Sequence, residues 1–333
     1  MEYRVLGRTG LDVSRVCLGT MTFGAKVDEA ESIEIIHRAL DFGVNFIDTA
    51  NIYVGGRSEE VVGKAIADRR DQVILVSKCS GALNGNPNSG GLSRTSIIRN
   101  VDASLARLGT DFLDILFLHF PDGKTGYEEI VQTMGMLVRQ GKIRYWGVSN
   151  FAAWKCCSLV HLAREAGLPG PVVSQNVYNV ITRGLDDELL PFLEEYGLGL
   201  VTFNPLAGGL LTGKYAHGQA VKGTRLADDA GYAQRYLKPA NVEAADKIAS
   251  LAAEMGDTSA QLAYRWLFGK DFITSIICGV SSMAQLESNL AACDADPLPP
   301  DVEAQLDALW DSFKGDYFNY HHARPLYPPP ASK

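Results

Sequence analysis

Four side chains able to take part in proton transfer follow apolar runs in the first 120 residues. Asp48 and Tyr53 follow the run 44–47, Lys78 ends the next run, and His119 ends a third. A nearby ammonium stabilises a phenolate and lowers the pKa of a tyrosine, and a carboxylate keeps that ammonium charged. A histidine can hold a substrate oxygen beside the phenol. The set predicts a site at which Tyr53 protonates a developing alkoxide.

Each of these residues also has an ordinary structural explanation. Asp48 could cap a helix, Tyr53 could pack in a loop, Lys78 could be a solvated loop cation, and His119 could be a hydrogen-bonded core histidine. The functional interpretation therefore depends on elements that bring all four side chains together.

Apolar segments typical of strands alternate with helical patterns along the whole chain. The predicted strands are 17–20, 44–50, 72–79, 112–119, 145–150, 171–179, 198–206 and 273–280. Eight strand–helix units without a break in composition predict one closed (β/α)8 TIM barrel, with strand ends from different units meeting at one rim. Asp48, Lys78 and His119 would then converge from three successive strands.

Several features extend beyond the barrel repeat. Residues 3–16 predict a β-hairpin before the barrel, the helix 58–69 is expected to begin with Ser58 as its cap, and the helix before 44 is expected to end at Gly43. A helical stretch runs from about 240 to 269, after a long loop at 207–239 that is expected to be functional. A C-terminal helix and tail occupy about 300–333, and the tail either covers the barrel or is partly disordered. We expect a single domain over 1–333, with its core at about 3–293.

The composition is that of a globular protein and excludes several functions. Acidic residues outnumber basic ones by 39 to 31, and the net charge of −8 opposes binding to nucleic acid. No apolar run approaches the roughly 20 residues that span a membrane, and the N-terminus does not resemble a secretory signal, so we expect a cytoplasmic protein. The cysteines have no CxxC spacing, and no cluster of histidines with ligand spacing falls at the strand ends, so no metal site is expected. Of the six histidines, His37 and His161 fall inside helical patterns, and His321 and His322 lie in the tail.

The motifs along the chain resemble those of the aldo-keto reductase superfamily. They are DTANIY at 48–53, VSK ending at Lys78, LH ending at His119, GVSNF at 147–151, SQNVYN at 174–179, FNPLAGGLLTGKY at 203–215 and GVSSMAQLESN at 279–289. The resemblance covers about residues 3–293. It implies a (β/α)8 barrel that binds an extended nicotinamide dinucleotide without a Rossmann motif, and no GxGxxG opens a βαβ unit here. It also implies that Asp48, Tyr53, Lys78 and His119 form an unsubstituted catalytic tetrad.

The resemblance assigns further residues to the cofactor. Ser149, Asn150 and Gln175 match positions that bind the nicotinamide carboxamide, and Phe203 matches the aromatic residue that stacks on its ring; the alternative for Phe203 is core packing. The diphosphate would be contacted by the segment after Phe203 and by a later arginine that closes over the cofactor in related proteins. Residues near the nicotinamide ribose would complete this set. The matching positions are Asn204, Pro205, Leu206, Gly208, Leu210, Lys214 and Arg225 for the diphosphate, and Thr20, Met21 and Asp48 for the ribose.

At the adenosine end the chain departs from many members of the superfamily. Lys and Arg are replaced by the uncharged residues Gly279, Ser281, Ser282, Gln285 and Asn289. Such groups can hold a 2′-phosphate without the bidentate charge of arginine. Members similar to potassium-channel β subunits and aflatoxin aldehyde reductases use a similar pattern with NADPH. We therefore expect NADP(H), with NAD(H) as the alternative.

The implied reaction is reduction of an aldehyde or ketone to an alcohol, or the reverse. Sugar dehydrogenation is one alternative, and a redox-sensing accessory subunit with little turnover is another. The presence of His119 and the lack of a long N-terminal extension argue against the subunit. The substrate would be a small carbonyl or alcohol compound such as a polyol, a sugar or an oxygenated polycycle, and the oligomeric state stays open. The polar loop 80–92 and the apolar residues Phe23, Phe120, Phe151 and Trp154 are the candidate pocket walls.

Overall fold

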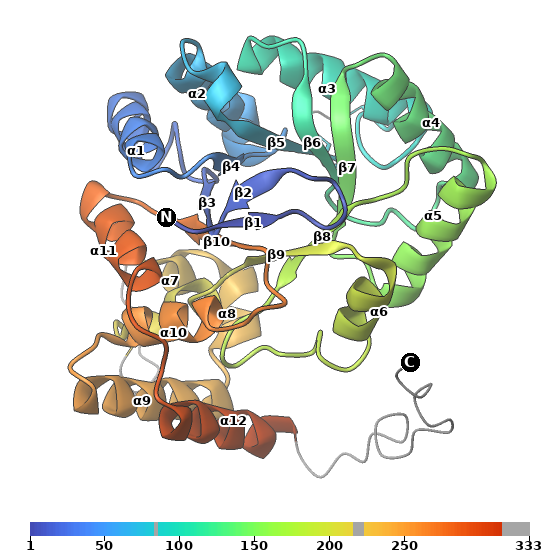
Figure 1. The fold of residues 1–333 in the computed structure, drawn as a ribbon. Coiled ribbons are helices and arrows are strands. Elements are labelled where there is room, and N and C mark those ends of the chain that lie inside the picture. Colours follow the sequence, from blue (N-terminus) through green and yellow to red (C-terminus); the bar gives the residue numbers. More distant parts are fainter. Residues whose placement is uncertain (83–85, 216–222, 315–333) are drawn as a thin grey trace, which may run out of the picture.

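The protein, described here as a computed structural model, contains a closed barrel of eight parallel strands. The structure describes residues 1–82, 86–215 and 223–314. The strands follow the order β10-β3-β4-β5-β6-β7-β8-β9 around the barrel, and helices surround them (Figure 1). The predicted (β/α)8 barrel is therefore confirmed. The barrel strands are β3 Val16–Gly19, β4 Phe46–Asp48, β5 Ile74–Cys79, β6 Leu113–Leu118, β7 Ile143–Ser149, β8 Val173–Val177, β9 Gly199–Phe203 and β10 Ser275–Gly279.

Six of the helices that follow barrel strands are amphipathic, with apolar side chains turned toward the sheet. They are α1 Glu29–Asp41, α2 Arg57–Ile66, α3 Arg94–Leu108, α4 Tyr127–Arg139, α5 Ala153–Glu165 and α6 Leu189–Tyr196. Between them and the strands lies the larger core cluster, which includes the fully buried Trp146 and Trp266. Because this apolar cluster stabilises the barrel, the polar side chains at the strand ends are not required for its core.

A two-stranded hairpin lies across one end of the barrel, as Figure 1 shows. It is formed by β1 Tyr3–Val5 and β2 Asp12–Ser14, which pair antiparallel as the sequence predicts. Leu6 and Val13 of this hairpin pack with Cys17, Phe46 and other side chains inside the barrel. The hairpin thus covers the end of the barrel at which the strands begin and leaves the opposite rim for the predicted site.

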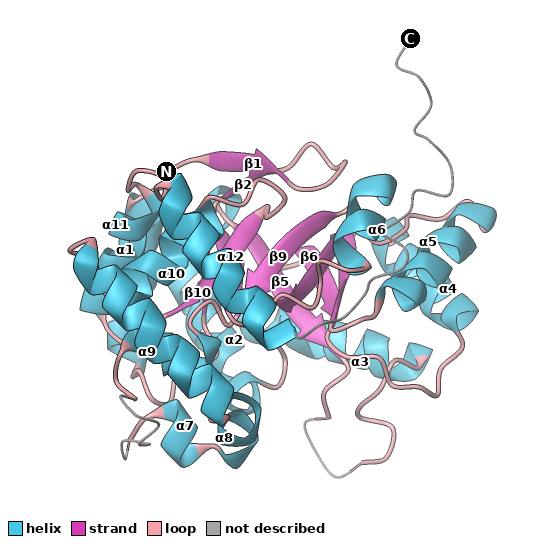
Figure 2. Ribbon diagram, turned by 90° about the horizontal axis from the view of Figure 1, so that it is seen from below, coloured by secondary structure: helices cyan, strands magenta, loops and turns pink. Residues whose placement is uncertain are grey.

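The remaining elements follow β9 and β10. They are the 3-10 segment η3 Ala207–Thr212, α7 Arg225–Asp228, α8 Ala230–Tyr236, α9 Pro239–Glu254, α10 Ser259–Phe268, α11 Met283–Cys293 and α12 Pro300–Lys314. The predicted C-terminal helix is confirmed as α12, which lies alongside α9 (Figure 2). The tail expected over or beside the barrel lies outside the described residues.

Three local predictions are settled by the backbone. Gly43 has a φ of 88° directly after α1, as expected of a residue that ends a helix. The prediction for Ser58 is wrong: α2 begins at Arg57 after Gly56, and the Ser58 hydroxyl is instead buried against Thr20. The stretch 240–269 is two helices, because Gly256 adopts a φ of 74° and Thr258 caps α10.

The segment expected as a long loop between 207 and 239 contains helical structure. Its described parts form η3, α7 and α8, and Asp229 caps α8 by accepting hydrogen bonds from two backbone amides. Three residues of η3, among them Gly208 and Gly209, have non-helical backbone angles. The described parts of this segment are therefore short, tightly turned pieces rather than an extended loop.

Candidate active site

The four predicted proton-transfer residues lie where neighbouring strands end. Asp48 is the last residue of β4, Lys78 is next to last in β5, and His119 directly follows β6. Since β4 pairs with β5 and β5 with β6, the three strand ends are adjacent. Tyr53 follows in the 3-10 turn η1 Tyr53–Gly56, which leads from the end of β4 into α2.

The Lys78 ammonium is the centre of the site. Its Nζ donates hydrogen bonds to Asp48 Oδ1 at 2.5 Å, to the Thr49 carbonyl oxygen at 2.9 Å and to Tyr53 Oη at 3.2 Å. Gln175 Nε2 donates to the other carboxylate oxygen of Asp48 at 2.8 Å. Three acceptors therefore hold the ammonium in one place, and the phenol oxygen is one of them.

The pKa of one residue of the site, Tyr53, differs from the value expected from the sequence. Burial would lower the pKa of Lys78, but Asp48 and Tyr53 outweigh it, and the pKa of Lys78 is raised. Burial raises the pKa of Tyr53, and the opposing effect of Lys78 does not cancel it in the chain alone. The expectation that Lys78 brings the pKa of Tyr53 below its ordinary value is thus wrong for the isolated chain. Tyr53 is a protonated phenol at neutral pH, and Lys78 is charged.

His119 is held as a neutral imidazole. Burial, and then the charge of Lys78, lower the pKa of His119 to about 3. Its Nδ1 is buried and has no hydrogen-bond partner among the described residues. The ring meets that of Tyr53 edge to face, with centroids 6.0 Å apart, and Phe120 stacks on it at 4.2 Å. Such a ring can donate or accept one hydrogen bond without carrying charge.

The residues expected at the nicotinamide carboxamide lie on the next two strands. Ser149 ends β7 and is in register with Gln175 of β8. Asn150 has a φ of 63°, and its Nδ2 donates to the His119 carbonyl oxygen at 3.0 Å. Gln175 bonds Asp48 in this structure, a contact that the sequence does not indicate. These residues therefore join the tetrad in one connected rim.

The residues expected at the ribose differ in accessibility. Thr20 follows β3 and is fully buried; its hydroxyl donates to the Asp48 carbonyl oxygen at 2.9 Å and contacts Ser58 Oγ. Met21 is exposed. The side chain of Thr20 is thus used to fix the end of β4, while Met21 remains accessible at the rim.

The predicted diphosphate segment begins at the end of β9. Phe203 is the last residue of that strand and is half-buried, and Asn204 has a φ of 56°. Pro205 is buried and Leu206 is half-buried, and Lys214 is exposed at the far end of the segment. Leu210 is buried in the core, so its side chain cannot contact a cofactor and only its backbone could do so.

Within this segment, the backbone of Gly208 lies closest to a side chain of another element, the Tyr232 ring. Its φ is 68°, and a Cβ there would come within 2.9 Å of Tyr232 Cδ1 in α8. Tyr232 lies between two guanidiniums, with the Arg225 Cζ 5.1 Å and the Arg235 Cζ 4.5 Å from the ring centre. Neither arginine pairs with a carboxylate in the ranges that the structure describes. The α7–α8 segment thus brings two unneutralised cations to the glycine-rich turn.

The residues expected at the adenosine end lie apart from the tetrad, after β10. The Gln285 side-chain oxygen accepts hydrogen bonds from the Ser281 amide at 2.9 Å and hydroxyl at 3.1 Å. Ser282 caps α11, Gly279 ends β10, and Asn289 is buried in α11. These two hydrogen bonds therefore fix the positions of Ser281 and Gln285 relative to one another.

Only two of the four aromatic residues expected as pocket walls are accessible. Phe120 is 44% exposed and Trp154 is 62% exposed. Phe23 and Phe151 are 0% and 2% exposed and pack in the hydrophobic core, so they are structural residues in this conformation. Sequence reasoning failed there because an aromatic residue near a strand end can turn its ring toward either the core or the rim.

Sequence reasoning also missed Thr49, Ser58 and Asn51. The Thr49 carbonyl oxygen binds Lys78, its hydroxyl contacts Ser58, and Asn51 ties the turn to its surroundings. The DTANIY motif includes Thr49 and Asn51, but a motif does not reveal which of its backbone and side-chain groups face inward.

Metal-ligand clusters and membrane-spanning helices are both absent from the described ranges. No group of three or more His, Cys, Asp or Glu side chains there could hold a metal ion. Among the helices described, none has the length and apolar character needed to cross a membrane.

The fold is that of the β/α barrel class, and a buried Lys–Asp pair, a phenol and a neutral imidazole lie together at the rim where its strands end. The model of the aldo/keto reductase family matches residues 15–311. The chain belongs to this family.

Curated relatives match nearly the whole chain. A probable voltage-gated potassium channel subunit beta of Oryza sativa subsp. japonica is 37% identical over 320 residues, covering 94% of this chain and 97% of the relative. A similarly described protein of Arabidopsis thaliana is 37% identical over 305 residues, covering 90% and 93%. The uncharacterized oxidoreductase YrpG of Bacillus subtilis is 37% identical over 306 residues, covering 88% and 91%.

Proposed function

We propose that this protein is a nicotinamide-dependent oxidoreductase that reduces an aldehyde or ketone to an alcohol, or catalyses the reverse reaction. The observation that carries the proposal is the contact of Lys78 Nζ with both Tyr53 Oη and the Asp48 carboxylate. Membership of the aldo/keto reductase family and the similarity to an oxidoreductase support it.

The residues on the β9 side of the rim fit an extended dinucleotide. Gly208 and Gly209 have positive φ, which glycine adopts without strain, and the lack of side chains lets this turn pack closely against Tyr232 and Tyr215. Arg225 and Arg235 provide positive charge that no carboxylate neutralises in the described parts of the chain. When bound, the reduced nicotinamide would supply the hydride.

The chain's own residues would handle the proton and the substrate oxygen. Lys78 donates to Tyr53 Oη, so the phenolic hydrogen of Tyr53 is left to point at a substrate. As the oxygen of the carbonyl becomes an alkoxide, Tyr53 gives up this proton and Lys78 stabilises the phenolate that remains. The neutral His119 ring can hydrogen-bond the same oxygen. Asp48 and Gln175 keep Lys78 in position.

Among the cofactors, we propose NADP(H). The supporting groups are Ser281, Gln285 and Asn289, which can hold a phosphate through hydroxyl and amide groups. Fluorescence titration of the purified protein with NADPH and NADH tests this choice. Tighter binding of NADPH is expected, and tighter binding of NADH would overturn it.

The proposed reaction is tested by a substrate panel. Sugars, ring-bearing ketones and simple aldehydes would be assayed in both directions with both cofactors, and sugar dehydrogenation is one of the activities that the panel includes. We expect a small-molecule substrate and a cytoplasmic protein without nucleic-acid or membrane partners. Bound cofactor together with no turnover of any carbonyl or alcohol would contradict the proposal.

A second candidate is an accessory subunit that binds the cofactor and turns over little substrate. The observation in its favour is the similarity to proteins described as probable or putative potassium channel subunits. Stopped-flow measurement separates the two functions. One rapid oxidation of bound NADPH followed by negligible steady-state turnover, together with co-purification of a membrane protein, would favour the subunit; sustained turnover would favour the enzyme.

A further inference from the structure

The segment that follows β5 lies directly against the turn that carries Tyr53. Its described residues are 80–82 and 86–92. A Cβ on Gly81 would come within 2.2 Å of Ile52 Cγ2, so the backbone of the segment touches the residue before Tyr53. The Ser80 hydroxyl accepts a hydrogen bond from the Phe120 amide at 3.1 Å. The segment therefore adjoins both the phenol turn and the aromatic ring stacked on His119.

A buried pair of amides joins this segment to the same turn. Asn51 Nδ2 donates to the Gly81 carbonyl oxygen at 3.0 Å and to Asn100 Oδ1 at 2.7 Å. Asn100 Nδ2 in turn donates to the Ser89 carbonyl oxygen at 3.2 Å. One side chain of α3 thus connects the far part of the segment with the residue that lies two positions before Tyr53.

Asn100 lies on the buried face of α3, with Ser96 one turn before it and Ser104 one turn after it. It is nearly fully buried, and its Nδ2 also donates to the Ser96 carbonyl oxygen at 2.9 Å, one turn earlier in the helix. Burying an amide costs free energy unless its hydrogen bonds are made. The hydrogen bonds that Asn100 makes with Asn51 and Ser89 offset this cost, and they also join two segments that lie far apart in the sequence.

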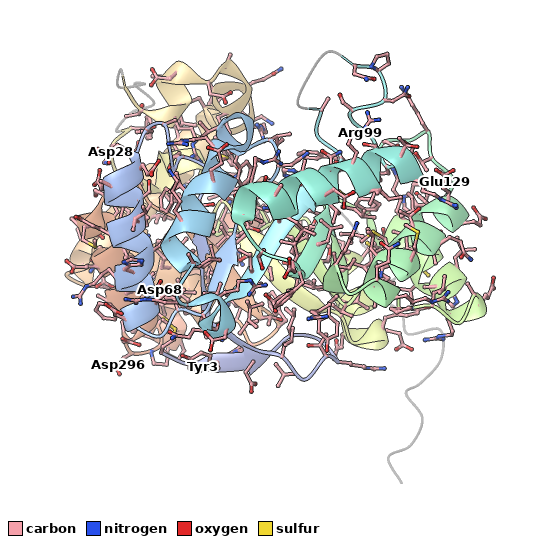
Figure 3. The ribbon with its side chains drawn as sticks, turned by 90° about the horizontal axis from the view of Figure 1, so that it is seen from above. Tyr3, Asp28, Asp68, Arg99, Glu129 and Asp296 are labelled. Atoms are coloured by element: carbon pink, nitrogen blue, oxygen red, sulfur yellow. The ribbon has the colours of Figure 1, made fainter. Side chains whose placement is uncertain are left out.

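A second anchor holds the end of the segment. Asp122 Oδ2 accepts a hydrogen bond from the Leu92 amide at 2.8 Å, and the Gly91 amide donates to the Ser80 carbonyl oxygen at 2.8 Å. Asp122 is itself fixed by the Thr125 hydroxyl at 2.6 Å. The two ends of the segment are therefore joined to each other and to the loop after β6. Figure 3 shows this side of the molecule, with Arg99 of α3 and Glu129 of α4 labelled, opposite the hairpin that carries Tyr3.

We propose that Asn100 is a positioning residue that holds the described rim residues, 80–82 and 86–92, against the Tyr53 turn, and that these placed residues select ring-bearing or long-chain carbonyl substrates over small aldehydes. The substrate clause rests on the proposed function. A substrate whose carbonyl lies at Tyr53 and whose body extends past Phe120 meets this segment, whereas a molecule of two or three carbons does not reach it. Losing the anchor would affect the first class and spare the second.

The experiment compares Asn100→Ala with Ser104→Ala, a matched control one turn further along α3. Steady-state kinetics would be measured with propanal and with a bulky aryl ketone, at saturating NADPH. For Asn100→Ala we expect the KM of the ketone to rise about tenfold, with its kcat and the KM of propanal within twofold of the wild type. Ser104→Ala should leave all three values unchanged.

A second variant removes the other anchor and guards against a folding defect. Asp122→Ala should raise the KM of the ketone in the same selective way. Limited proteolysis of both anchor variants with cofactor bound should show faster cleavage within 86–92 than in the wild type. Equal rises of KM for both substrates, or no change in either, would overturn the selection of substrates. Unchanged proteolysis would overturn the anchoring role.

The same measurements separate this inference from the proposed function. If the wild type binds NADPH but reduces neither compound, the proposed function is wrong, and the proposed selection of substrates is wrong as well. The anchoring role of Asn100 then stands or falls on the proteolysis alone.

Discussion

The Lys78 ammonium lies 2.5 Å from Asp48 Oδ1, and the two side chains are only 0% and 3% exposed. Removing both charges from water costs several kcal/mol per ion, and the attraction between them offsets this cost only in part. Replacing such a pair by apolar groups is often neutral or stabilising. Stability therefore does not account for this ion pair, whereas a fixed cation beside the Tyr53 hydroxyl does.

Removal of one partner should be more damaging than removal of both. Lys78→Met leaves the Asp48 carboxylate buried without its cation and should lower the free energy of unfolding by about 3–5 kcal/mol. Adding Asp48→Asn should restore most of this loss, while turnover stays abolished in both variants. Urea unfolding measures the first effect and the reductase assay the second.

The control for this pair is an exposed ion pair. Lys142→Met removes the partner of Asp102 on the surface and should cost less than about 1 kcal/mol. A double variant no more stable than Lys78→Met alone would contradict the interpretation of the buried pair.

Tyr53→Phe should remove the proton donor and leave the rest of the site in place. We expect kcat for carbonyl reduction to fall about 10²–10⁴-fold, with NADPH binding unchanged in a fluorescence titration. Tyr3→Phe is the matched control, because Tyr3 lies on the hairpin at the other end of the barrel and its hydroxyl donates to the Gly43 carbonyl oxygen. Full turnover by Tyr53→Phe would exclude the proposed reaction.

The rate of reduction should not show a histidine titration near neutrality. An ordinary histidine titrates near pH 6.5, but burial and Lys78 lower the pKa of His119 to about 3. Because the pKa of Tyr53 is raised, its proton is retained through neutral pH. We expect kcat/KM to be flat from about pH 6 to 9. An acid limb near pH 6.5 that is absent from His119→Gln would contradict this assignment.

The same histidine should make the fold sensitive to acid. Between pH 6.5 and about 3 the unfolded chain binds a proton at His119 and the folded chain does not, so stability falls as the pH falls through this range. The slope approaches about 1.4 kcal/mol per pH unit for one proton. Urea unfolding from pH 7 to 5 should show a smaller loss for His119→Gln than for the wild type; equal losses would show that His119 is not responsible.

Arg225 should contribute to cofactor binding through its charge beside the glycine-rich turn. Arg225→Ala is expected to raise the Kd of NADPH about tenfold, or about 1.4 kcal/mol, and to make binding less sensitive to salt. Arg144→Ala, which removes an arginine stacked on Phe112 elsewhere in the molecule, serves as the control. Equal affinities of the two variants would show that Arg225 does not contact the cofactor.

The alternation of strands and helices could be predicted from the sequence, because an element that buries one face has apolar residues at regular spacing. The β4, β5 and β6 ends were predictable for the same reason, since Asp48, Lys78 and His119 each interrupt an apolar run. The start of α2 was not predictable. Ser58 is a residue type that often caps a helix. Its hydroxyl instead hydrogen-bonds the hydroxyls of Thr20 and Thr49, and nothing in the sequence near Ser58 indicates these contacts.

Long-range contacts also decided how each polar group is used. Gln175 bonds Asp48 across 127 positions, and Asn100 bonds Asn51 across 49. Phe23 and Phe151 turn into the core, whereas Phe120 stacks on His119 at the rim. Local pattern carries no information on these choices, because they depend on which side chains the closed barrel brings to the same point.

The sequence by itself determined the barrel, the order of its elements and the four side chains that meet at its rim, because burial imposes periodicity and strand ends in a barrel converge. The tertiary structure alone decided the protonation of the site and the packing around it. The pKa values of Tyr53 and His119 depend on how completely the surrounding chain excludes water, and that exclusion exists only once β4, β5 and β6 lie side by side.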